Sequence, residues 1–129
     1  IAIATTQIFS KQTHGTLAVI SSVAGERGRK SNYIYGACKS ATNTLLQGLQ
    51  TRFYGTDIHI INIKPGMIDT PMTKGFKKGP LWATPEQIAP AICTAIEKHK
   101  PEIFAPSYWK YIMFIIKRLP TILLARLSI

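Results

Sequence analysis

Three side chains near the start of the sequence, Ser22, Tyr35 and Lys39, have the types and spacing needed for proton transfer to a carbonyl group. Tyr35 and Lys39 lie four residues apart at the start of a predicted helix, so their side chains share one face. A tyrosine hydroxyl is a poor base at neutral pH because its usual pKa is about 10, and an ammonium group one turn away favours the phenolate. Ser22 follows a predicted buried strand, where its hydroxyl can donate to a substrate carbonyl oxygen. The three residues therefore predict acid–base catalysis on a carbonyl or an alcohol.

The hydrophobic pattern predicts the strands that must position these side chains. Residues 16–21 are a short, continuously apolar and β-branched run, typical of a strand buried on both faces. Residues 57–63 are predicted to form a second buried strand, and residues 102–106 a short third one. Strands that alternate with helices indicate an α/β fold with a parallel sheet. Because three strands are fewer than an open doubly wound sheet normally has, we expect residues 1–106 to form the C-terminal half of a Rossmann-like doubly wound parallel sheet.

Helices are predicted over residues 1–13, over residues 34–53 and from Pro85 to about Lys100. Thr84 is expected to cap the last helix, with Gln87 three residues later completing a capping box. The long helix is expected to have an apolar stripe that recurs every four residues: Ala37, Ala41, Leu45, Leu49 and Phe53.

Two sequence motifs resemble the active-site region of single-domain short-chain dehydrogenases/reductases. Ser-Ser-Val-Ala-Gly at 21–25 and Tyr-Gly-Ala-Cys-Lys at 35–39 have that family's order and spacing. The segment Ile-Lys-Pro-Gly-Met-Ile-Asp-Thr-Pro-Met at 63–72 resembles the family's Pro-Gly motif with its following threonine. A Tyr-x-x-x-Lys pair alone occurs by chance in many helices, whereas the combination of these motifs is specific. The similarity covers roughly residues 1–106.

The resemblance implies a role for each matched residue. Tyr35 would be the general acid in ketone reduction or the base in alcohol oxidation. Lys39 would hold the ribose hydroxyls of the cofactor and tune Tyr35, and Ser22 would orient the substrate carbonyl. The cofactor implied is NAD or NADP, with NADP slightly favoured. Its binding residues would be Tyr35, Lys39, Pro65, Gly66, Ile68 through its amide, and Thr70 through its hydroxyl.

The resemblance is incomplete on the cofactor side. The family's glycine-rich turn, which holds the pyrophosphate, has no counterpart in the sequence, and the asparagine that completes the family's catalytic group would fall before Ile1. Asn32, Asn43 and Asn62 all follow Ser22 in the sequence, so none of them can take the place of that missing asparagine. We therefore expect that these 129 residues alone do not bind a dinucleotide in the family's manner. Two alternatives follow: the full protein is roughly twice as long, or an N-terminal half that would supply the first strands has been removed.

The function expected is an NAD(P)-dependent oxidoreductase that interconverts a carbonyl and a secondary alcohol by hydride transfer. One alternative is a related enzyme that uses the Tyr–Lys pair to epimerise or dehydrate nucleotide sugars, although such relatives usually carry a larger substrate domain. Another is a non-catalytic, truncated or membrane-surface-binding fragment. Intact Ser22, Tyr35 and Lys39 argue against loss of activity in the parent protein.

The formal net charge of +10, from 16 Lys and Arg against 6 Asp and Glu, first suggests nucleic acid as a partner. The cations are spread along the chain without a nucleic-acid-binding motif, so no nucleic-acid partner is expected. The phosphates of a cofactor or an acidic membrane surface are better partners for this charge. The three histidines share no spacing, so no metal site is expected, and Cys38 and Cys93 are expected to be free thiols.

The location expected is cytoplasmic, because no signal peptide is apparent, with peripheral attachment to a membrane as the alternative. The resemblance implies a homo-oligomer, since family members are commonly dimers or tetramers. Ser21 is interpreted as a strand-end residue and Asp69 as a turn residue. The lysines of the long loop, Lys74, Lys77 and Lys78, are expected to belong to a solvated lid, with contact to an anionic substrate as the alternative.

Residues 107–129 are predicted to form a basic amphipathic helical tail that Pro120 interrupts. Residues 108–129 carry four cations and no acidic residue, and their charges break every apolar run before it could span a bilayer. The residues expected to share one polar face are Lys110, Lys117, Thr121 and Ser128.

Two interpretations of this tail remain open. It can lie on a membrane surface with Trp109 and Tyr111 at its edge, or it can pack on its own domain or on a dimer partner. A similar tail occurs in family members that reduce keto-sugars on polyprenyl-phosphate lipids. The substrate is therefore expected to be a small-molecule or lipid-linked carbonyl or alcohol compound.

Overall fold

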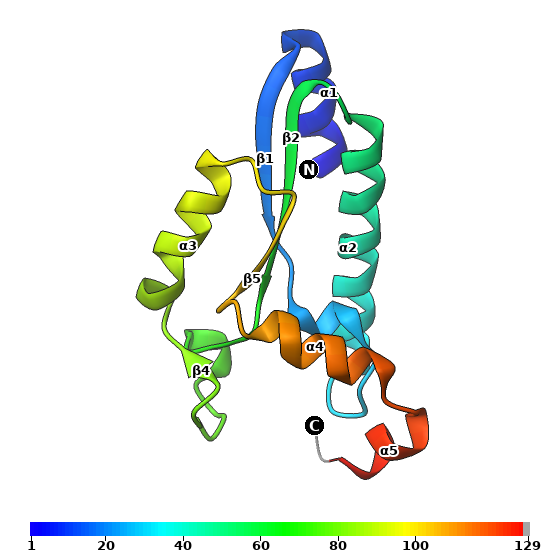
Figure 1. Cartoon of the computed structure of the whole chain (residues 1–129), viewed down its shortest axis with the longest axis vertical. Helices are drawn as coiled ribbons and strands as arrows, with labels where there is room; N and C mark the ends of the chain where they lie inside the picture. The colour runs from blue at the N-terminus through cyan, green and yellow to red at the C-terminus, as the bar shows by residue number, and fades with distance from the viewer. Residues whose placement is uncertain (128–129) are drawn as a thin grey trace.

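A computed structural model describes residues 1–127 of the chain, and it shows an α/β fold built along two long strands (Figure 1). The order of the main elements confirms the α/β fold class predicted from the sequence. These elements are α1 (Ala2–Gln12), β1 (His14–Ile20), α2 (Tyr33–Arg52), β2 (Asp57–Pro65), α3 (Pro85–Glu97) and β5 (Glu102–Ala105).

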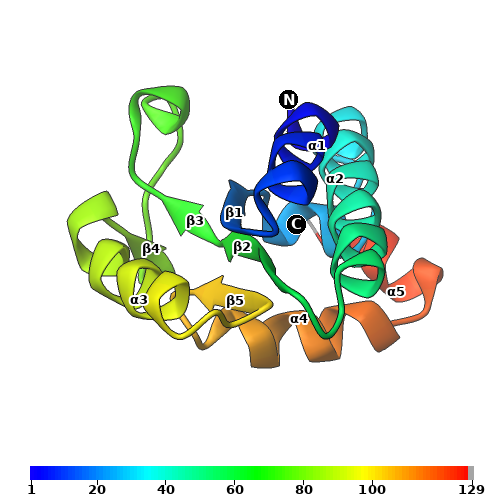
Figure 2. The same cartoon turned by 90° about the horizontal axis from the view of Figure 1, so that it is seen from above.

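The main sheet has the strand order β1-β2-β5, and both neighbouring pairs are parallel. Side chains alternate along β2, so Ile58 and Ile60 point to the face that α1 and α2 cover, and their cluster includes Leu46 and Leu49 of α2. Ile103 of β5 packs with α3 in a second cluster, and Figure 2 shows α3 on the side of the sheet away from α1 and α2. Helices on both faces explain why most of β2 is buried on both sides of the sheet.

Local sequence determines where the helices end. Thr13 closes α1 in the left-handed conformation, with a φ of 65°, and β1 begins at the next residue. The predicted capping box of α3 is confirmed, because the Thr84 hydroxyl accepts from the Gln87 amide at 3.3 Å and the Gln87 side chain accepts from the Thr84 amide at 2.8 Å.

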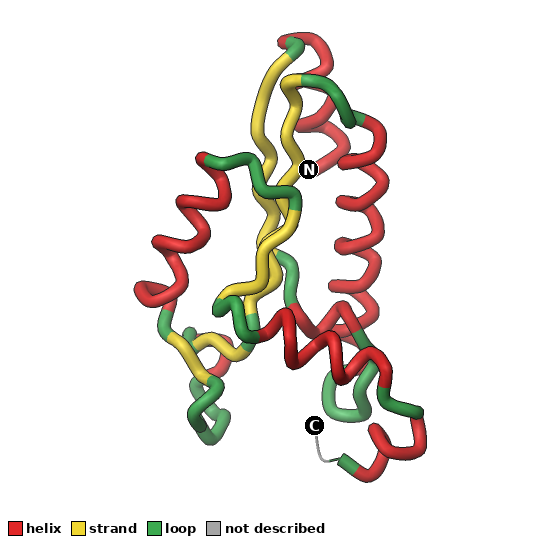
Figure 3. Tube along the Cα trace, in the orientation of Figure 1, coloured by secondary structure: helices red, strands yellow, loops and turns green. Residues whose placement is uncertain are grey.

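The predicted loops contain short elements that the sequence pattern does not reveal. Ser22 opens a 3₁₀ turn, η1 (Val23–Glu26), and the loop after β2 contains β3 (Met67–Ile68), η2 (Pro71–Thr73) and β4 (Trp82–Ala83). β3 and β4 pair in parallel as a separate sheet. Figure 3 shows most of this loop structure gathered at the end of the molecule where β1 and β2 terminate.

The buried face of α2 differs in part from the stripe predicted for it. Leu49 and Phe53 are buried as expected, but Ala37, Ala41 and Leu45 are exposed, and Leu46 is also buried. A repeat of four residues drifts around a helix of 3.6 residues per turn, so a series of five such residues cannot stay on a single face. The sheet contacts the face that carries Leu46 and Leu49.

The tail folds as two helices, α4 (Trp109–Arg118) and α5 (Thr121–Arg126), separated at Pro120 as predicted. Trp109 is only 2% exposed and forms a core cluster with Val23, Met113, Ile116 and Leu124. The sequence interpretation of Trp109 as an interfacial anchor is therefore wrong, because this indole lies in the domain's own core. The break at Pro120 also removes the single polar face predicted through Thr121, and Ser128 lies outside the described residues. None of the helices within residues 1–127 has both the length and the apolar character that crossing a membrane requires.

Replacing Leu46 with alanine should destabilise the chain by about 2–5 kcal/mol, because Leu46 is 1% exposed and its removal leaves a cavity between α2 and the sheet. Leu45, which is 42% exposed, is the matched control, and Leu45→Ala should cost less than about 1 kcal/mol. Urea unfolding followed by circular dichroism measures both free energies. If Leu45→Ala lost more unfolding free energy than Leu46→Ala, the buried face of α2 would be the one predicted from the sequence.

Candidate active site

The residues predicted to carry chemistry lie where β1 and β2 end. Ser22 follows β1 after Ser21, whose amide donates to the Ile63 carbonyl at 2.7 Å and so joins the ends of the two strands. Pro65 ends β2 and Gly66 follows it. Tyr35 and Lys39 are in the first turns of α2. The carboxyl edge of a parallel sheet is the usual ligand site of such folds.

The hydroxyl of Ser22 is positioned by the turn that it opens. Ser22 is buried, and its Oγ accepts a hydrogen bond from the Ala24 amide at 3.1 Å. This bond uses an oxygen lone pair, and the hydroxyl proton can still be donated to another acceptor. The geometry suits a group that donates to a carbonyl oxygen from a fixed position.

Tyr35 and Lys39 lie on one side of α2, as their spacing predicts. The Lys39 Nζ lies 5.7 Å from the centre of the Tyr35 ring and donates to the Ile20 carbonyl at 3.1 Å. Tyr35 is 40% exposed, so its side chain remains accessible to a ligand. The bond to Ile20 uses one of the three ammonium donors and fixes Lys39 against the end of β1.

The turn η1 presses closely on the start of α2. A Cβ on Gly25 would lie 2.6 Å from the Lys39 carbonyl carbon, and a Cβ on Gly36 would lie 3.0 Å from the Ala24 carbonyl oxygen. Both positions therefore favour glycine for reasons of space. The close contact sets the position of Ser22 relative to the Tyr35–Lys39 pair.

The segment from Pro65 to Thr70 is partly exposed directly after the buried strand β2. Gly66 lies against the indole of Trp109, and an added Cβ would come within 1.8 Å of the Trp109 Nε1. Ile68 is paired in β3, and Thr70 begins η2, where its amide donates to the Thr73 hydroxyl at 3.0 Å. Thr73 also donates to the Ile68 carbonyl at 2.9 Å, which ties the two ends of this segment together.

A buried ion-pair network that the sequence analysis missed joins these parts. The Lys64 Nζ, in a side chain that is 3% exposed, lies 2.7 Å from the Glu26 carboxylate and also pairs with Glu102 of β5. Lys117 of α4 contacts the other oxygen of Glu26 at 2.7 Å. A lysine between two apolar residues at the end of a buried strand is the sequence signal, because such a cation requires a partner.

Glu26 is held in its charged form by these lysines. Burial raises the pKa of Glu26, but hydrogen bonds from Lys117 and Lys64, together with their charges, outweigh it and hold that pKa below its usual value of 4.5. The carboxylate also accepts a bond from the Asn43 amide nitrogen at 3.4 Å, so α2 joins the same network.

Ser21 has a structural position in this network. It is buried, and its hydroxyl donates to the Asn43 side-chain oxygen at 2.7 Å. The same oxygen accepts from Asn62 of β2 at 3.0 Å. Ser21, Asn43 and Asn62 thus link β1, α2 and β2 through buried polar groups, which agrees with the interpretation of Ser21 as a strand-end residue.

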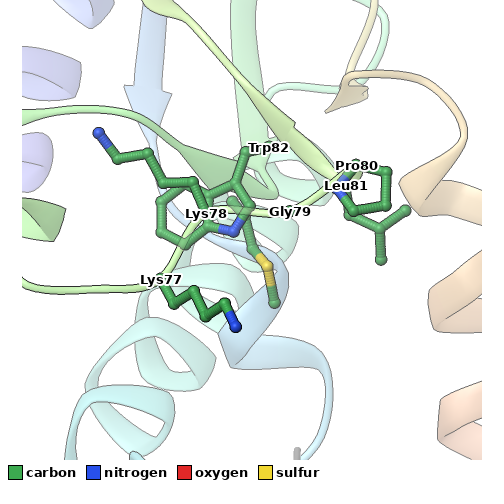
Figure 4. A pocket seen from close by; sticks show the side chains of 7 residues that line it. Lys77, Lys78, Gly79, Pro80, Leu81 and Trp82 are labelled. Atoms are coloured by element: carbon green, nitrogen blue, oxygen red, sulfur yellow. The ribbon is translucent and has the colours of Figure 1, made fainter.

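A shallow pocket of about 330 Å³ lies beside this site under the long loop, and its lining residues are Met67, Lys77, Lys78, Gly79, Pro80, Leu81 and Trp82 (Figure 4). Lys78 pairs with Asp69, which thereby links the two sides of the loop. The Tyr108 hydroxyl donates to the Leu81 carbonyl at 3.1 Å and attaches the loop to the segment before α4. The pocket combines apolar walls with a positive rim.

Two of the three histidines contact each other, which their sequence spacing does not indicate. His59 and His99 stack with their ring centres 3.7 Å apart. Within residues 1–127, no group of three or more His, Cys, Asp or Glu side chains is arranged to hold a metal ion. The stacked rings lie on β2 and just after α3, away from Ser22 and Tyr35 along the chain.

Comparison with known proteins places these features in a wider context. The sequence profile of the family described as short chain dehydrogenase matches residues 1–80. An uncharacterized oxidoreductase of Streptomyces coelicolor is 34% identical over 120 residues, which cover 92% of this chain and 47% of the relative. The chain thus spans about half the length of this relative.

Two solved structures have the same fold. A 7β-hydroxysteroid dehydrogenase has a TM-score of 0.78 at 23% identity over 95% of this chain and 51% of its own. A short chain dehydrogenase from Burkholderia cenocepacia, solved in complex with NADP, has a TM-score of 0.76 at 20% identity over 92% of this chain and 51% of its own. Their fold agrees with a half of a Rossmann-like sheet, the architecture predicted from the sequence.

Lys64→Met should destabilise the chain by about 3 kcal/mol or more, because it leaves the buried Glu26 carboxylate without its closest enclosed partner. Lys117→Met is the matched control: this lysine is half-exposed, and its loss should cost less than about 1 kcal/mol. Chemical denaturation of both variants measures the difference. Equal losses of unfolding free energy in the two variants would show that the burial of Lys64 does not make its ion pair with Glu26 more important for stability.

The lowered pKa of Glu26 predicts a specific acid sensitivity. A depressed pKa in the folded state stabilises the fold above the unfolded value, and this stability is lost as the pH falls through the folded value. Glu26→Gln should therefore reduce the loss of unfolding free energy between about pH 5 and pH 3. The exposed Glu97, changed to glutamine, is the control and should leave the profile unchanged. If the unfolding free energy of Glu26→Gln fell with pH as steeply as that of the wild type, Glu26 would not be the source of the acid sensitivity.

Proposed function

The chain belongs to the short chain dehydrogenase family, and from this premise we propose that the whole protein is an oxidoreductase that interconverts a carbonyl and a secondary alcohol. The observation that carries the proposal is the arrangement at the carboxyl edge of the sheet. Ser22 there keeps a hydroxyl proton to donate, and Tyr35 is exposed one helical turn from Lys39. These are the groups that proton transfer to a carbonyl requires.

In this proposal Ser22 donates to the substrate carbonyl oxygen and fixes its orientation. Tyr35 gives its hydroxyl proton to the same oxygen as reduction proceeds, or takes the proton from the alcohol in the reverse direction. Lys39 has ammonium protons left after its bond to Ile20 and can stabilise the phenolate form of Tyr35. The buried Glu26–Lys64 pair keeps the Ser22 turn in register with the end of β2.

The cofactor proposed is NAD or NADP, with NADP slightly favoured, and it would supply or accept the hydride. The side chains of the site fit a nicotinamide dinucleotide, because Lys39 and Tyr35 can both donate hydrogen bonds to its ribose hydroxyls. The partly exposed segment of Pro65, Gly66, Ile68 and Thr70 can line the nicotinamide. A Burkholderia cenocepacia protein with this fold was solved with NADP, which supports the nicotinamide class. The positive charge of the chain favours the phosphates of either cofactor.

The pocket under the long loop is the proposed place for the rest of the substrate. It begins at Met67, one residue after Gly66, and its walls include Pro80, Leu81 and Trp82. Figure 4 shows the Trp82 ring close to the two lysine side chains, with Pro80 and Leu81 farther along the loop. These walls suit a small or lipid-linked substrate with an apolar portion next to its carbonyl.

Tyr35→Phe in the full-length protein should lower kcat by at least about 100-fold, because the phenyl ring has no proton to transfer. Cofactor affinity, measured by fluorescence titration, should stay within about threefold of the wild type, since the other proposed contacts remain. Tyr33→Phe is the matched control: this exposed tyrosine has Ala37 four residues later and should keep full activity. Wild-type turnover in Tyr35→Phe would refute the role of Tyr35.

A further inference from the structure

The two helices of the tail have an exposed apolar side that the domain core leaves uncovered. Both helices bury their inner residues in one cluster, which contains Met113 and Ile116 of α4 and Leu124 of α5. Most of their remaining large side chains are exposed, and Phe114 also lines a pocket shared with Lys64, Glu102 and Phe104 of the domain. We call these exposed residues the outer face: Tyr111, Phe114, Ile115, Ile122, Leu123 and Leu127.

Cations accompany the outer face, and the two helices that carry it contain no acidic residue. Arg118 lies on it, with its guanidinium 3.5 Å from the centre of the Phe114 ring, and Lys110 and Arg126 are exposed on the same two helices. Residues 108–127 contain no Asp or Glu. The positive charge is therefore not neutralised within the tail itself.

The loop that follows Ser22 adds further positive charge and fixes the tail in place. The Arg27 guanidinium donates to the Leu119 carbonyl at 3.2 Å and to the Thr121 hydroxyl at 3.3 Å, across the break between α4 and α5. Lys30 donates to the Ala125 carbonyl at 3.4 Å. In Figure 1 both helices lie at the end of the molecule where β1 and β2 terminate.

We propose that the outer face is a docking surface for an anionic lipid membrane, on which α4 and α5 lie in the plane of the headgroups. Exposed aromatic and aliphatic side chains enter the boundary between headgroups and acyl chains, and the flanking cations contact the lipid phosphates. A second copy of the chain is the less suitable occupant, because pairing two outer faces would bring their cations together without acidic partners.

Docking in this position would place the Ser22 turn next to the lipid surface, since Arg27 and Lys30 connect the two. The docking proposal does not depend on the proposed enzyme activity, because lipid binding is measured without turnover. The two can therefore fail separately.

The experiment is flotation of the purified chain with vesicles of phosphatidylcholine alone and of phosphatidylcholine with phosphatidylglycerol. Binding is expected with the anionic vesicles and should weaken markedly at high salt, which screens the cations. Ile115→Ser combined with Ile122→Ser should weaken binding by about tenfold or more, because both side chains are more than half exposed and would insert. Arg118→Gln should weaken it about fivefold.

Matched controls lie on α1, at the opposite end of the molecule from α5 (Figure 1). Ile8→Ser removes an exposed isoleucine, and Lys11→Gln removes one positive charge. Both should bind vesicles within about twofold of the wild type, because the tail is unchanged. Circular dichroism confirms that each variant is folded.

Three results would overturn the proposal. The first is the absence of binding to anionic vesicles. The second is equal weakening by the α1 controls, which would show that binding follows overall charge and not the outer face. The third is self-association in sedimentation that the Ile115→Ser, Ile122→Ser variant abolishes while vesicle binding persists, which would assign the face to a second copy.

Discussion

The buried carboxylate of Glu26 is the interaction on which the arrangement of the site depends. It belongs to the turn that Ser22 opens, and it meets Lys64 at the end of β2, Lys117 of α4 and Asn43 of α2. A charge in such a place is tolerated only when partners surround it, because the cost of leaving water must be offset locally. Moving any one of these elements would leave the carboxylate underpaired, so the network resists displacement of the turn.

Steric contacts fix the spacing between the elements of the site more tightly than the ion pairs can. Ion pairs tolerate small shifts, whereas the contact of Gly25 with the backbone of Lys39 and that of Gly66 with Trp109 leave no room for a Cβ. These two contacts lie on either side of the site, one between the Ser22 turn and α2, the other between the end of β2 and α4. The ion pairs therefore hold these elements together, and dense packing sets how closely they approach one another. The core position of Trp109 follows from the same requirement.

The sequence predicted those features that depend on neighbouring residues. The three strands of the main sheet, the capping box at Thr84, the helix break at Pro120 and the shared side of Tyr35 and Lys39 are all local patterns. The partners of Lys64 were not predictable in this way, because Glu26 and Glu102 lie 38 residues away from it in each direction. The buried side of α2 was also misjudged: both sides carry apolar residues, and only contact with the sheet distinguishes them.

The tail shows how two apparently opposed interpretations of one segment can describe different faces of it. Residues 108–127 are apolar enough to supply an inner row that ends in the core and an outer row that does not. Burial of Trp109 excludes that residue from a lipid contact, yet it also fixes α4 so that Ile115 and its neighbours stay exposed. Packing on the domain is therefore the condition for presenting a rigid outer face, because a tail without that packing would have no fixed orientation. The short helices follow from Pro120, which turns α5 back toward the same cluster and lets both inner rows share it.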